Sequence, residues 1–293
     1  MTETPLEDRL RSPRVLVAPG VADTLGAVLA ERAGFEAVFL SGSAMSYAHL
    51  GRPDIGLLSL GEIAAITARI AERVGIPVLV DADSGFGNAY HVHRCVRALE
   101  RAGAACVQIE DKVNAPDARD MSSNPVVATA DMRDKLRAAL DARHSDSTLI
   151  SARTDALSTE GLSGALARIE AYADAGADAL FVTGIATADD RRDVLRCVDG
   201  RLPVIFNMAV PGGASPPAVA VLEREGFSVA LLPATVIGAA ASAMSAALYE
   251  LAAQLPGITA RDAEETRTSP FSVADAIRGG EFLAKHRNWS NPQ

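Results

Sequence analysis

The chain has 293 residues, of which 48% are hydrophobic and 4% aromatic, and its formal net charge is −9. The acidic excess argues against a nucleic-acid partner, because phosphate backbones are bound by clustered lysine and arginine. The polar N-terminus lacks a signal-peptide core, no apolar run approaches the roughly 20 residues of a membrane span, and the three cysteines show no metal-ligand spacing, so we expect a cytoplasmic protein with reduced, buried thiols.

Short apolar runs alternate with helix-period segments from one end of the chain to the other, and each run predicts a β-strand. The eight runs are 14–18, 37–41, 78–82, 106–110, 148–152, 179–183, 204–208 and 229–233. Continuous apolar strands that alternate with helices are typical of a parallel sheet covered on both faces. Eight such units predict a (β/α)8 TIM barrel, which needs about 250 residues.

An open doubly wound sheet is the alternative fold. It would usually carry a glycine-rich phosphate turn after its first strand, and here that turn reads A-P-G-V-A-D, which is no dinucleotide fingerprint. We therefore predict a barrel catalytic domain over residues 1–255. Residues 256–293 predict a C-terminal helical extension that packs on the barrel or on a neighbouring subunit.

Polar residues follow several predicted strands at the end where such barrels hold their active sites. Asp81 and Asp83 close the third strand, Glu110 closes the fourth, and Asp54 lies in a loop after the second. A single acid at a strand end is often a helix cap or a structural ion pair, but acids from adjacent strands form a hard oxygen cluster. Such a cluster suits Mg²⁺ or Mn²⁺.

Other strand ends offer groups for an anionic substrate. Arg153, at the end of the fifth strand, could pair bidentately with a carboxylate or a phosphonate. The backbone N–H groups of Gly42 and Ser43 could bind a second anionic group. The sequence thus predicts a small polyanionic substrate that chelates a metal.

These strand-end segments carry a family resemblance. The stretches R-P-D-I-G, V-D-A-D-S-G-F-G-N, C-V-Q-I-E-D-K and I-S-A-R-T-D-A, with A-P-G-V-A-D-T-L-G-A-V-L-A-E-R-A-G-F, resemble the isocitrate lyase / phosphoenolpyruvate mutase superfamily. The likeness runs from about Arg14 to about Ala253 and is closest to the methylisocitrate-lyase-like and phosphonomutase-like branches. It implies a barrel whose eighth helix is exchanged between subunits of a dimer, with dimers pairing to tetramers. It also implies Mg²⁺, an enolate of a 2-oxo acid or a carboxylic acid, and the making or breaking of C–C or P–C bonds.

The resemblance also implies roles for single residues. Asp81 would be the principal metal ligand, with Asp83, Asp54 and Glu110 holding the metal directly or through its waters. Arg153 would stabilise the developing enolate, so Arg153 and Glu110 are the catalytic candidates. The implied substrate-binding residues are Ser41, Gly42, Ser43, Arg153, Asn207 and Thr183, the last standing where the lyases carry a glutamate.

The loop after the fourth strand departs from both branches. The lyases carry a K-R/K-C-G-H motif whose cysteine acts as general acid/base, whereas this chain reads P-D-A-R-D over 116–120, with Ala118 at the place of the cysteine. The P-K-x-N-S-type loop of the phosphonomutase branch is absent as well. The polar candidates for the missing catalytic role are Asp117, Arg119, Asp120 and Ser122. A solvated loop is the alternative, and we expect the segment 113–125 to form a lid.

These features favour a Mg²⁺-dependent lyase or decarboxylase that acts on a small 2-hydroxy or 2-oxo di- or tricarboxylate through a metal-stabilised enolate. Decarboxylation of an oxaloacetate-like acid needs no cysteine acid. A P–C bond enzyme is the first alternative, since the E-D-K stretch at 110–112 is similar to the phosphonomutase branch. A non-catalytic dicarboxylate-binding homologue is the second. We expect a homodimer or homotetramer with neither a nucleic-acid nor a membrane partner.

Overall fold

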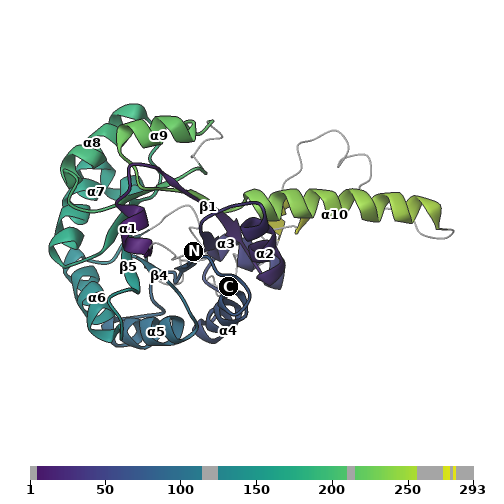
Figure 1. The fold of residues 1–293 in the computed structure, drawn as a ribbon, viewed down its shortest axis with the longest axis horizontal. Helices are drawn as coiled ribbons and strands as arrows, with labels where there is room; N and C mark the ends of the chain where they lie inside the picture. Colours follow the sequence, from purple (N-terminus) through teal and green to yellow (C-terminus); the bar gives the residue numbers. More distant parts are fainter. Residues whose placement is uncertain (1–4, 114–124, 210–214, 256–272, 278–279, 282–293) are drawn as a thin grey trace, which may run out of the picture.

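The structure is a computed structural model that describes residues 5–113, 125–209, 215–255, 273–277 and 280–281. Eight parallel strands close into a barrel in chain order, with β1 pairing with both β2 and β8 (Figure 1). The strands are β1 (Leu16–Val21), β2 (Val38–Leu40), β3 (Val78–Asp81), β4 (Cys106–Glu110), β5 (Leu149–Thr154), β6 (Ala179–Val182), β7 (Val204–Asn207) and β8 (Val229–Leu232). The predicted TIM barrel is confirmed, and the open sheet is excluded.

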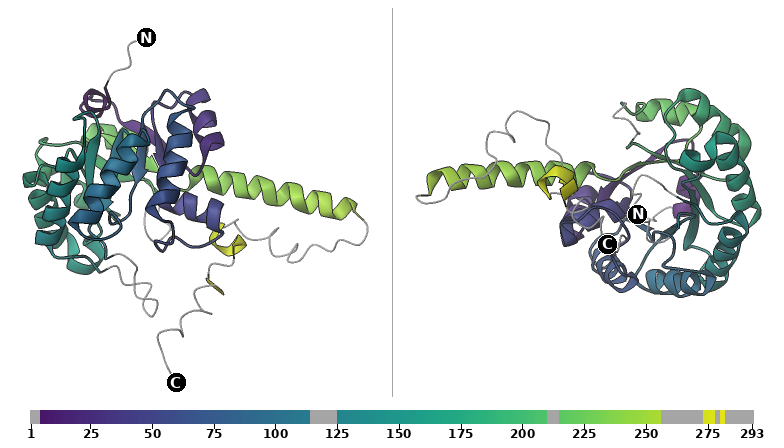
Figure 2. Two further views of the ribbon diagram at one scale, coloured as in Figure 1. Left: turned by 90° about the horizontal axis from the view of Figure 1, so that it is seen from below. Right: turned by 180° about the vertical axis from the view of Figure 1, so that it is seen from behind.

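Helices α2 to α9 surround this barrel in the order expected for repeated βα units, whereas α10 projects from it (Figures 1 and 2). In the described ranges they are α1 (Leu6–Leu10), α2 (Thr24–Arg32), α3 (Gly42–Met45), the π-helix η1 (Ser46–Leu50), α4 (Leu60–Ala71), α5 (Ala89–Arg101), α6 (Thr129–Ala142), α7 (Leu157–Asp174), α8 (Ala188–Val198), α9 (Val219–Glu225), α10 (Thr235–Gln254) and α12 (Val273–Ala276). Side-chain caps begin several of them. Ser59, for example, forms a full capping box with Glu62 at the start of α4.

The largest error in strand position concerns β1. The prediction placed this strand at 14–18 and a turn over A-P-G-V-A-D, but the strand continues through Pro19 and Gly20 to Val21. Gly20 packs against the backbone of Pro233, and a Cβ atom at this position would collide with the Pro233 carbonyl. Glycine therefore serves a close approach of two strands here, not a reversal of the chain.

The alternation of side chains along each strand divides the core into two layers. One cluster contains inward-facing residues such as Leu79, Cys106 and Leu149, together with Leu6 and Leu10 of α1, which therefore packs against the interior of the barrel. The other cluster joins the outward-facing strand residues to the surrounding helices. The register pairs Glu110 directly with Arg153 across β4 and β5.

The cysteines behave largely as expected. All three are free thiols; Cys95 and Cys106 are buried, and Cys197 is partly buried. Burial raises the pKa of Cys95 and Cys106 to about 12, so neither thiol is activated as a nucleophile.

Helix α10 extends away from the barrel, and none of its 20 residues is buried (Figure 2). It is long and apolar enough, by length and composition alone, to cross a membrane, so the expectation that no apolar run approaches that length was wrong. Of the predicted extension 256–293, the described part includes α12, which contacts α10. The boundary at residue 255 and the helix exchange stay predictions.

Candidate active site

At the carboxyl ends of β3, β4 and β5, the last inward-facing residue is charged. Because side chains alternate, the phase that turns Leu79, Cys106 and Leu149 into the barrel also turns Asp81, Glu110 and Arg153 inward. The same end of the barrel holds all the predicted site residues in the described ranges: Ser41, Gly42, Ser43, Asp54, Asp81, Asp83, Glu110, Arg153, Thr183 and Asn207.

A pocket enclosing about 400 Å³, part of it open to solvent, lies at this end. Charged side chains dominate its lining, which consists of Asp54, Ile55, Gly56, Asp81, Asp83, Ser84, Glu110, Lys112, Val113 and Arg153. The pocket is therefore built for a small, highly polar ligand rather than an apolar one.

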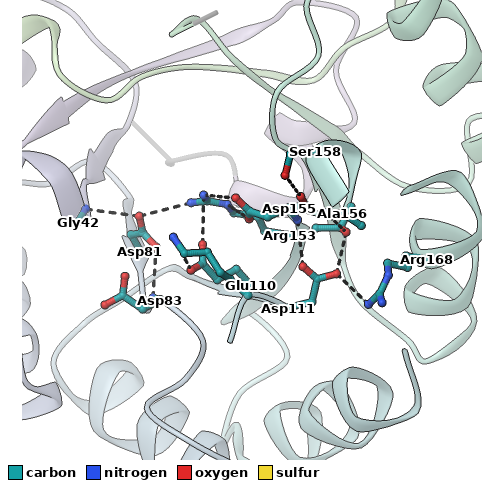
Figure 3. A network of polar contacts seen from close by, with 12 residues as sticks. Gly42, Asp81, Asp83, Glu110, Asp111, Arg153, Asp155, Ala156, Ser158 and Arg168 are labelled. Atoms are coloured by element: carbon teal, nitrogen blue, oxygen red, sulfur yellow. Dashed lines mark hydrogen bonds and ion pairs between the residues drawn. The ribbon is translucent and has the colours of Figure 1, made fainter. Parts of the chain in front are cut away.

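Arg153 is the best-fixed group of the pocket (Figure 3). Its Nε and Nη2 donate to the two carboxylate oxygens of Asp155 at 2.8 and 3.0 Å. Nη2 also lies 3.1 Å from Oε2 of Glu110, and the ring of Phe181 lies 5.4 Å from the guanidinium carbon. Burial alone would lower the pKa of Arg153, but Asp155 and Glu110 raise it well above its usual value, so the guanidinium stays charged.

The carboxylates are less well compensated than the arginine. Burial, and then the charges of Asp81, Glu110 and Asp54, raise the pKa of Asp83 to about 8. Burial also raises the pKa of Glu110 to about 7, although Arg153 opposes that shift. The pKa of Asp54 is raised by burial and by Asp81. The pocket thus concentrates negative charge that a cation would stabilise.

Divalent metal ions such as Mg²⁺ fit the donor chemistry and the charge of this set. As the side chains stand, however, no three histidine, cysteine or acidic side chains of the described residues converge closely enough to hold an ion directly. Mg²⁺ keeps several waters in many protein sites, which eases the requirement for direct ligands. The set therefore fits a hydrated divalent ion better than one caged by carboxylates alone.

The segment after β2 approaches these acids through its backbone. The Gly42 N–H donates to Oδ2 of Asp81 at 3.4 Å, and a Cβ atom on Gly42 would lie 3.2 Å from that oxygen. Ser41 caps α3 through the Ala44 N–H, and its hydroxyl lies 3.0 Å from that of Ser43. These residues adjoin the acid cluster without lining the pocket, and the Gly42 N–H is directed at Asp81.

Thr183 and Asn207 lie at the same end of the barrel, also outside the pocket lining. The Thr183 hydroxyl is buried and has no hydrogen-bond partner in the described ranges, whereas Oδ1 of Asn207 accepts from the Ala209 N–H at 2.9 Å. The candidates of the loop, Asp117, Arg119, Asp120 and Ser122, lie outside the described residues, and so does the core of the predicted lid.

Comparison with known proteins identifies the family. The profile of the phosphoenolpyruvate phosphomutase family matches residues 6–252. The chain is 36% identical over 294 aligned positions to 2-methylisocitrate lyase of Aeropyrum pernix, covering 97% of this chain and 94% of that one. The chain belongs to the PEP mutase/isocitrate lyase superfamily.

Solved structures of this superfamily share the fold over nearly the whole chain. The crystal structure of 2,3-dimethylmalate lyase superposes with a TM-score of 0.79 and 30% identity, covering 96% of this chain and 95% of that one. A phosphonopyruvate hydrolase in complex with oxalate and Mg²⁺ gives a TM-score of 0.77 and 28% identity, covering 98% of both chains. The superfamily resemblance seen in the strand-end motifs is confirmed.

Sequence reasoning missed two charged residues of this superfamily site. Lys112 lines the pocket with Nζ 3.6 Å from Oε1 of Glu110, and Asp155 is the partner that clamps Arg153. Each stands two residues beyond an inward-facing strand residue, so the period-2 alternation could have found both. Burial would lower the pKa of Lys112, but Glu110 and Asp155 raise it above its usual value, so the pocket contains a second permanent cation.

Proposed function

We propose that the protein is a carbon–carbon lyase or decarboxylase that acts on a small 2-hydroxy or 2-oxo di- or tricarboxylate through an enolate. The observation that carries this proposal is a rigidly held, charged arginine among four clustered carboxylates in one small pocket, two of which, Asp81 and Glu110, are buried. The names of two relatives, 2-methylisocitrate lyase and 2,3-dimethylmalate lyase, support C–C chemistry.

Mg²⁺, with Mn²⁺ as a substitute, is the cofactor that we propose for this pocket. Asp81, Asp83, Asp54 and Glu110 would hold it, and when bound it would supply Lewis-acid stabilisation of negative charge on oxygen. The similar phosphonopyruvate hydrolase, whose crystal structure is a complex with oxalate and Mg²⁺, supports this assignment.

The two cationic side chains of the pocket, Arg153 and Lys112, would bind different parts of the substrate. Arg153 cannot rotate freely, because Asp155 grips two of its nitrogens, so its donors are preorganised for the oxygen on which the enolate charge develops. Lys112 offers a point charge for a second carboxylate of the same substrate. We propose Ser41, Gly42, Ser43, Thr183 and Asn207 as residues around the rest of the ligand.

Protonation of the enolate after bond cleavage needs a general acid, and none of the residues lining the pocket is identified as that acid. Asp117, Arg119 and Asp120 are our candidates in the loop 113–125, which we propose to act as a lid. Decarboxylation is the variant of the reaction that depends least on such a group, because carbon dioxide leaves as the enolate forms and protonation from solvent can follow.

A P–C bond enzyme is the second candidate function. The hydrolase that acts on phosphonopyruvate is similar in fold and sequence, and Lys112 is a cation that could pair with a phosphonate. A homologue that binds dicarboxylates without turnover is the third candidate.

The products formed beside pyruvate distinguish these functions, because cleavage of any of the four test substrates releases pyruvate, whereas a mutase would convert phosphonopyruvate to phosphoenolpyruvate alone. We would incubate the protein and Mg²⁺ with oxaloacetate, 2-methylisocitrate, 2,3-dimethylmalate and phosphonopyruvate. Carbon dioxide, succinate or propionate beside pyruvate supports the lyase or decarboxylase, whereas phosphate or phosphoenolpyruvate from phosphonopyruvate supports the P–C enzyme. Metal-dependent binding of oxalate with no product from any substrate would leave the non-catalytic homologue.

We also propose that the protein is a cytoplasmic homodimer or homotetramer in which α10 packs against a second copy. The exposed large side chains near the end of α10 include Met244, Leu248 and Leu251, which are spaced four and three residues apart and so lie on one face of the helix. Light scattering should show a dimer or tetramer, and Leu248→Glu should shift it toward the monomer. A monomeric wild-type protein would contradict the proposal.

A further inference from the structure

A second group of buried charges lies outside the barrel, between β4, β5 and α7. Asp111 follows Glu110 in the opposite phase and points away from the pocket, toward Arg168 of α7 (Figure 3). Tyr172 of α7 contacts the same carboxylate. Asp111 and Tyr172 have no exposed surface, and Arg168 is 5% exposed. No residue of this group lines the pocket.

The Asp111 carboxylate accepts hydrogen bonds from four donors. Tyr172 Oη and Thr154 Oγ1 each donate at 2.7 Å, the Asp155 N–H donates at 2.9 Å, and Nη1 of Arg168 lies at 3.3 Å. A buried carboxylate with this many partners is held in one orientation, because loss of any donor would leave a desolvated charge.

One branch of the network leads to the catalytic arginine. Oδ1 of Asp111 fixes the backbone N–H of Asp155, whose side chain grips Arg153 with two hydrogen bonds. The position of the guanidinium therefore depends on a carboxylate on the other face of the strand.

The other branch leads to the segment that carries Lys112. The carbonyl oxygen of Asp111 accepts from the Val127 N–H at 2.8 Å, and Arg168 Nη1 donates to the Val127 carbonyl at 2.9 Å. Lys112 forms a β-bridge with Val126 between these contacts. Arg168 is itself anchored by two hydrogen bonds from its guanidinium to Glu160 at 2.7 and 2.8 Å.

We propose that Tyr172 and Arg168 are positioning residues, which act through Asp111 to fix both cations of the pocket, Arg153 and Lys112, for an anionic ligand. This inference rests on the proposed function of the pocket as a carboxylate site. It assigns to α7, a helix with no side chain in the pocket lining, control over the strength of ligand binding.

The test uses oxalate as the probe, because it is a small dicarboxylate found with Mg²⁺ in a related structure. Tyr172→Phe removes one hydroxyl and keeps the ring. Its matched control is Thr67→Val, which removes a buried helix hydroxyl that donates to the Ile63 carbonyl at 2.8 Å, far from the network. Calorimetric titration in Mg²⁺ should show oxalate affinity about tenfold weaker in Tyr172→Phe and unchanged in Thr67→Val, at a similar loss of melting temperature.

A double-mutant cycle separates positioning from general loosening of the fold. If Tyr172 acts through Arg153, then Tyr172→Phe should weaken oxalate binding much less in an Arg153→Lys background than in the wild type. Equal, independent effects of the two substitutions would overturn the inference, and so would a Tyr172→Phe affinity equal to that of the control.

A second variant covers the case in which Tyr172→Phe does not fold. Glu160→Gln, at the partly exposed end of the network, weakens the anchor of Arg168 and should reduce oxalate affinity about two- to threefold in the same direction. A wild-type protein that neither binds oxalate nor turns over any test substrate is a separate result, which would overturn the proposed function itself.

Discussion

Glu110, the last residue of β4, and Asp111, which follows it, are both buried, and yet their side chains lie in different surroundings. Glu110 lies beside two cations, Arg153 at 3.1 Å and Lys112 at 3.6 Å, yet burial, with the charges of Asp155 and Asp81, still raises its pKa to about 7. Asp111 faces four hydrogen-bond donors, one of them an arginine. A single step along the chain thus separates a carboxylate that shares its cations with neighbouring acids from one that is bound by four donors.

This difference distinguishes buried charges that bind a ligand from buried charges that stabilise the fold. A satisfied buried charge fixes geometry, whereas clustered carboxylates with raised pKa values cost stability unless a ligand compensates them. The pocket side should therefore respond to metal and pH, and the α7 side should respond to loss of donors.

The largest expected effect is on catalysis, from Asp81→Ala. Removal of this acid from the centre of the pocket should lower kcat/KM with the preferred substrate by about 10³-fold, because charge stabilisation of the transition state is lost. Steady-state kinetics at saturating Mg²⁺ measure the change. Asp141→Asn, on the exposed side of α6, serves as control and should leave kcat/KM unaltered. Full activity in Asp81→Ala would contradict the proposed function.

The difference between Glu110 and Asp111 can be tested by measuring the free energy of unfolding of variants at each position. Asp111→Asn should lower the free energy of unfolding by about 3 kcal/mol, because an amide cannot accept from all four donors and leaves Arg168 without its buried countercharge. Glu110→Gln in metal-free protein should change it by less than about 1 kcal/mol, since it also removes carboxylate repulsion. Urea unfolding measures both values, and equal losses would remove the distinction.

Lys112 is the second cation of the pocket, and its substitution tests its role in substrate binding. Lys112→Gln should raise KM for a dicarboxylate about tenfold with a smaller change in kcat, because the lysine binds a carboxylate remote from the reacting centre. Arg137→Gln removes an exposed charge of α6 and should change neither constant. A selective loss of kcat would instead place Lys112 at the reacting atoms.

The smallest expected effect is a dependence of stability on pH. Folding raises the pKa of Asp83 from 3.8 to about 8 and that of Glu110 from 4.5 to about 7, so the folded protein binds more protons than the unfolded chain between these values. The stability of the metal-free protein is therefore greatest at low pH and is lost as pH rises through about 7 to 8.

The melting temperature in EDTA should accordingly fall by several degrees between about pH 5.5 and 8.5, and Mg²⁺ should restore it mainly at the higher pH. Asp83→Asn should flatten this profile, whereas Asp111→Asn should keep its slope. A flat profile for the wild type in EDTA would show that these acids are compensated without a metal.

Much of the fold could be predicted from the sequence, because it follows from local patterns. Apolar runs marked all eight strands, and the period-2 phase turned Asp81, Glu110 and Arg153 toward one end of the barrel. Pro19 and Gly20 misled the prediction, because both residues favour turns and the contact with Pro233 that requires the glycine is not local. The network around Asp111 was not predicted for the same reason, because Arg168 lies 57 residues further along the chain.

The direct register of Glu110 and Arg153 has a consequence for how this barrel could change its chemistry over evolution. Paired strands are held about 4.8 Å apart by backbone hydrogen bonds, so the spacing of this ion pair is inherited from the ladder and not from any loop. Sequence drift in the connecting segments can therefore exchange proton donors and reshape ligand preference while the anion-stabilising pair stays in place. A scaffold of this kind can support descendants with different bond-breaking reactions without rebuilding its charge geometry.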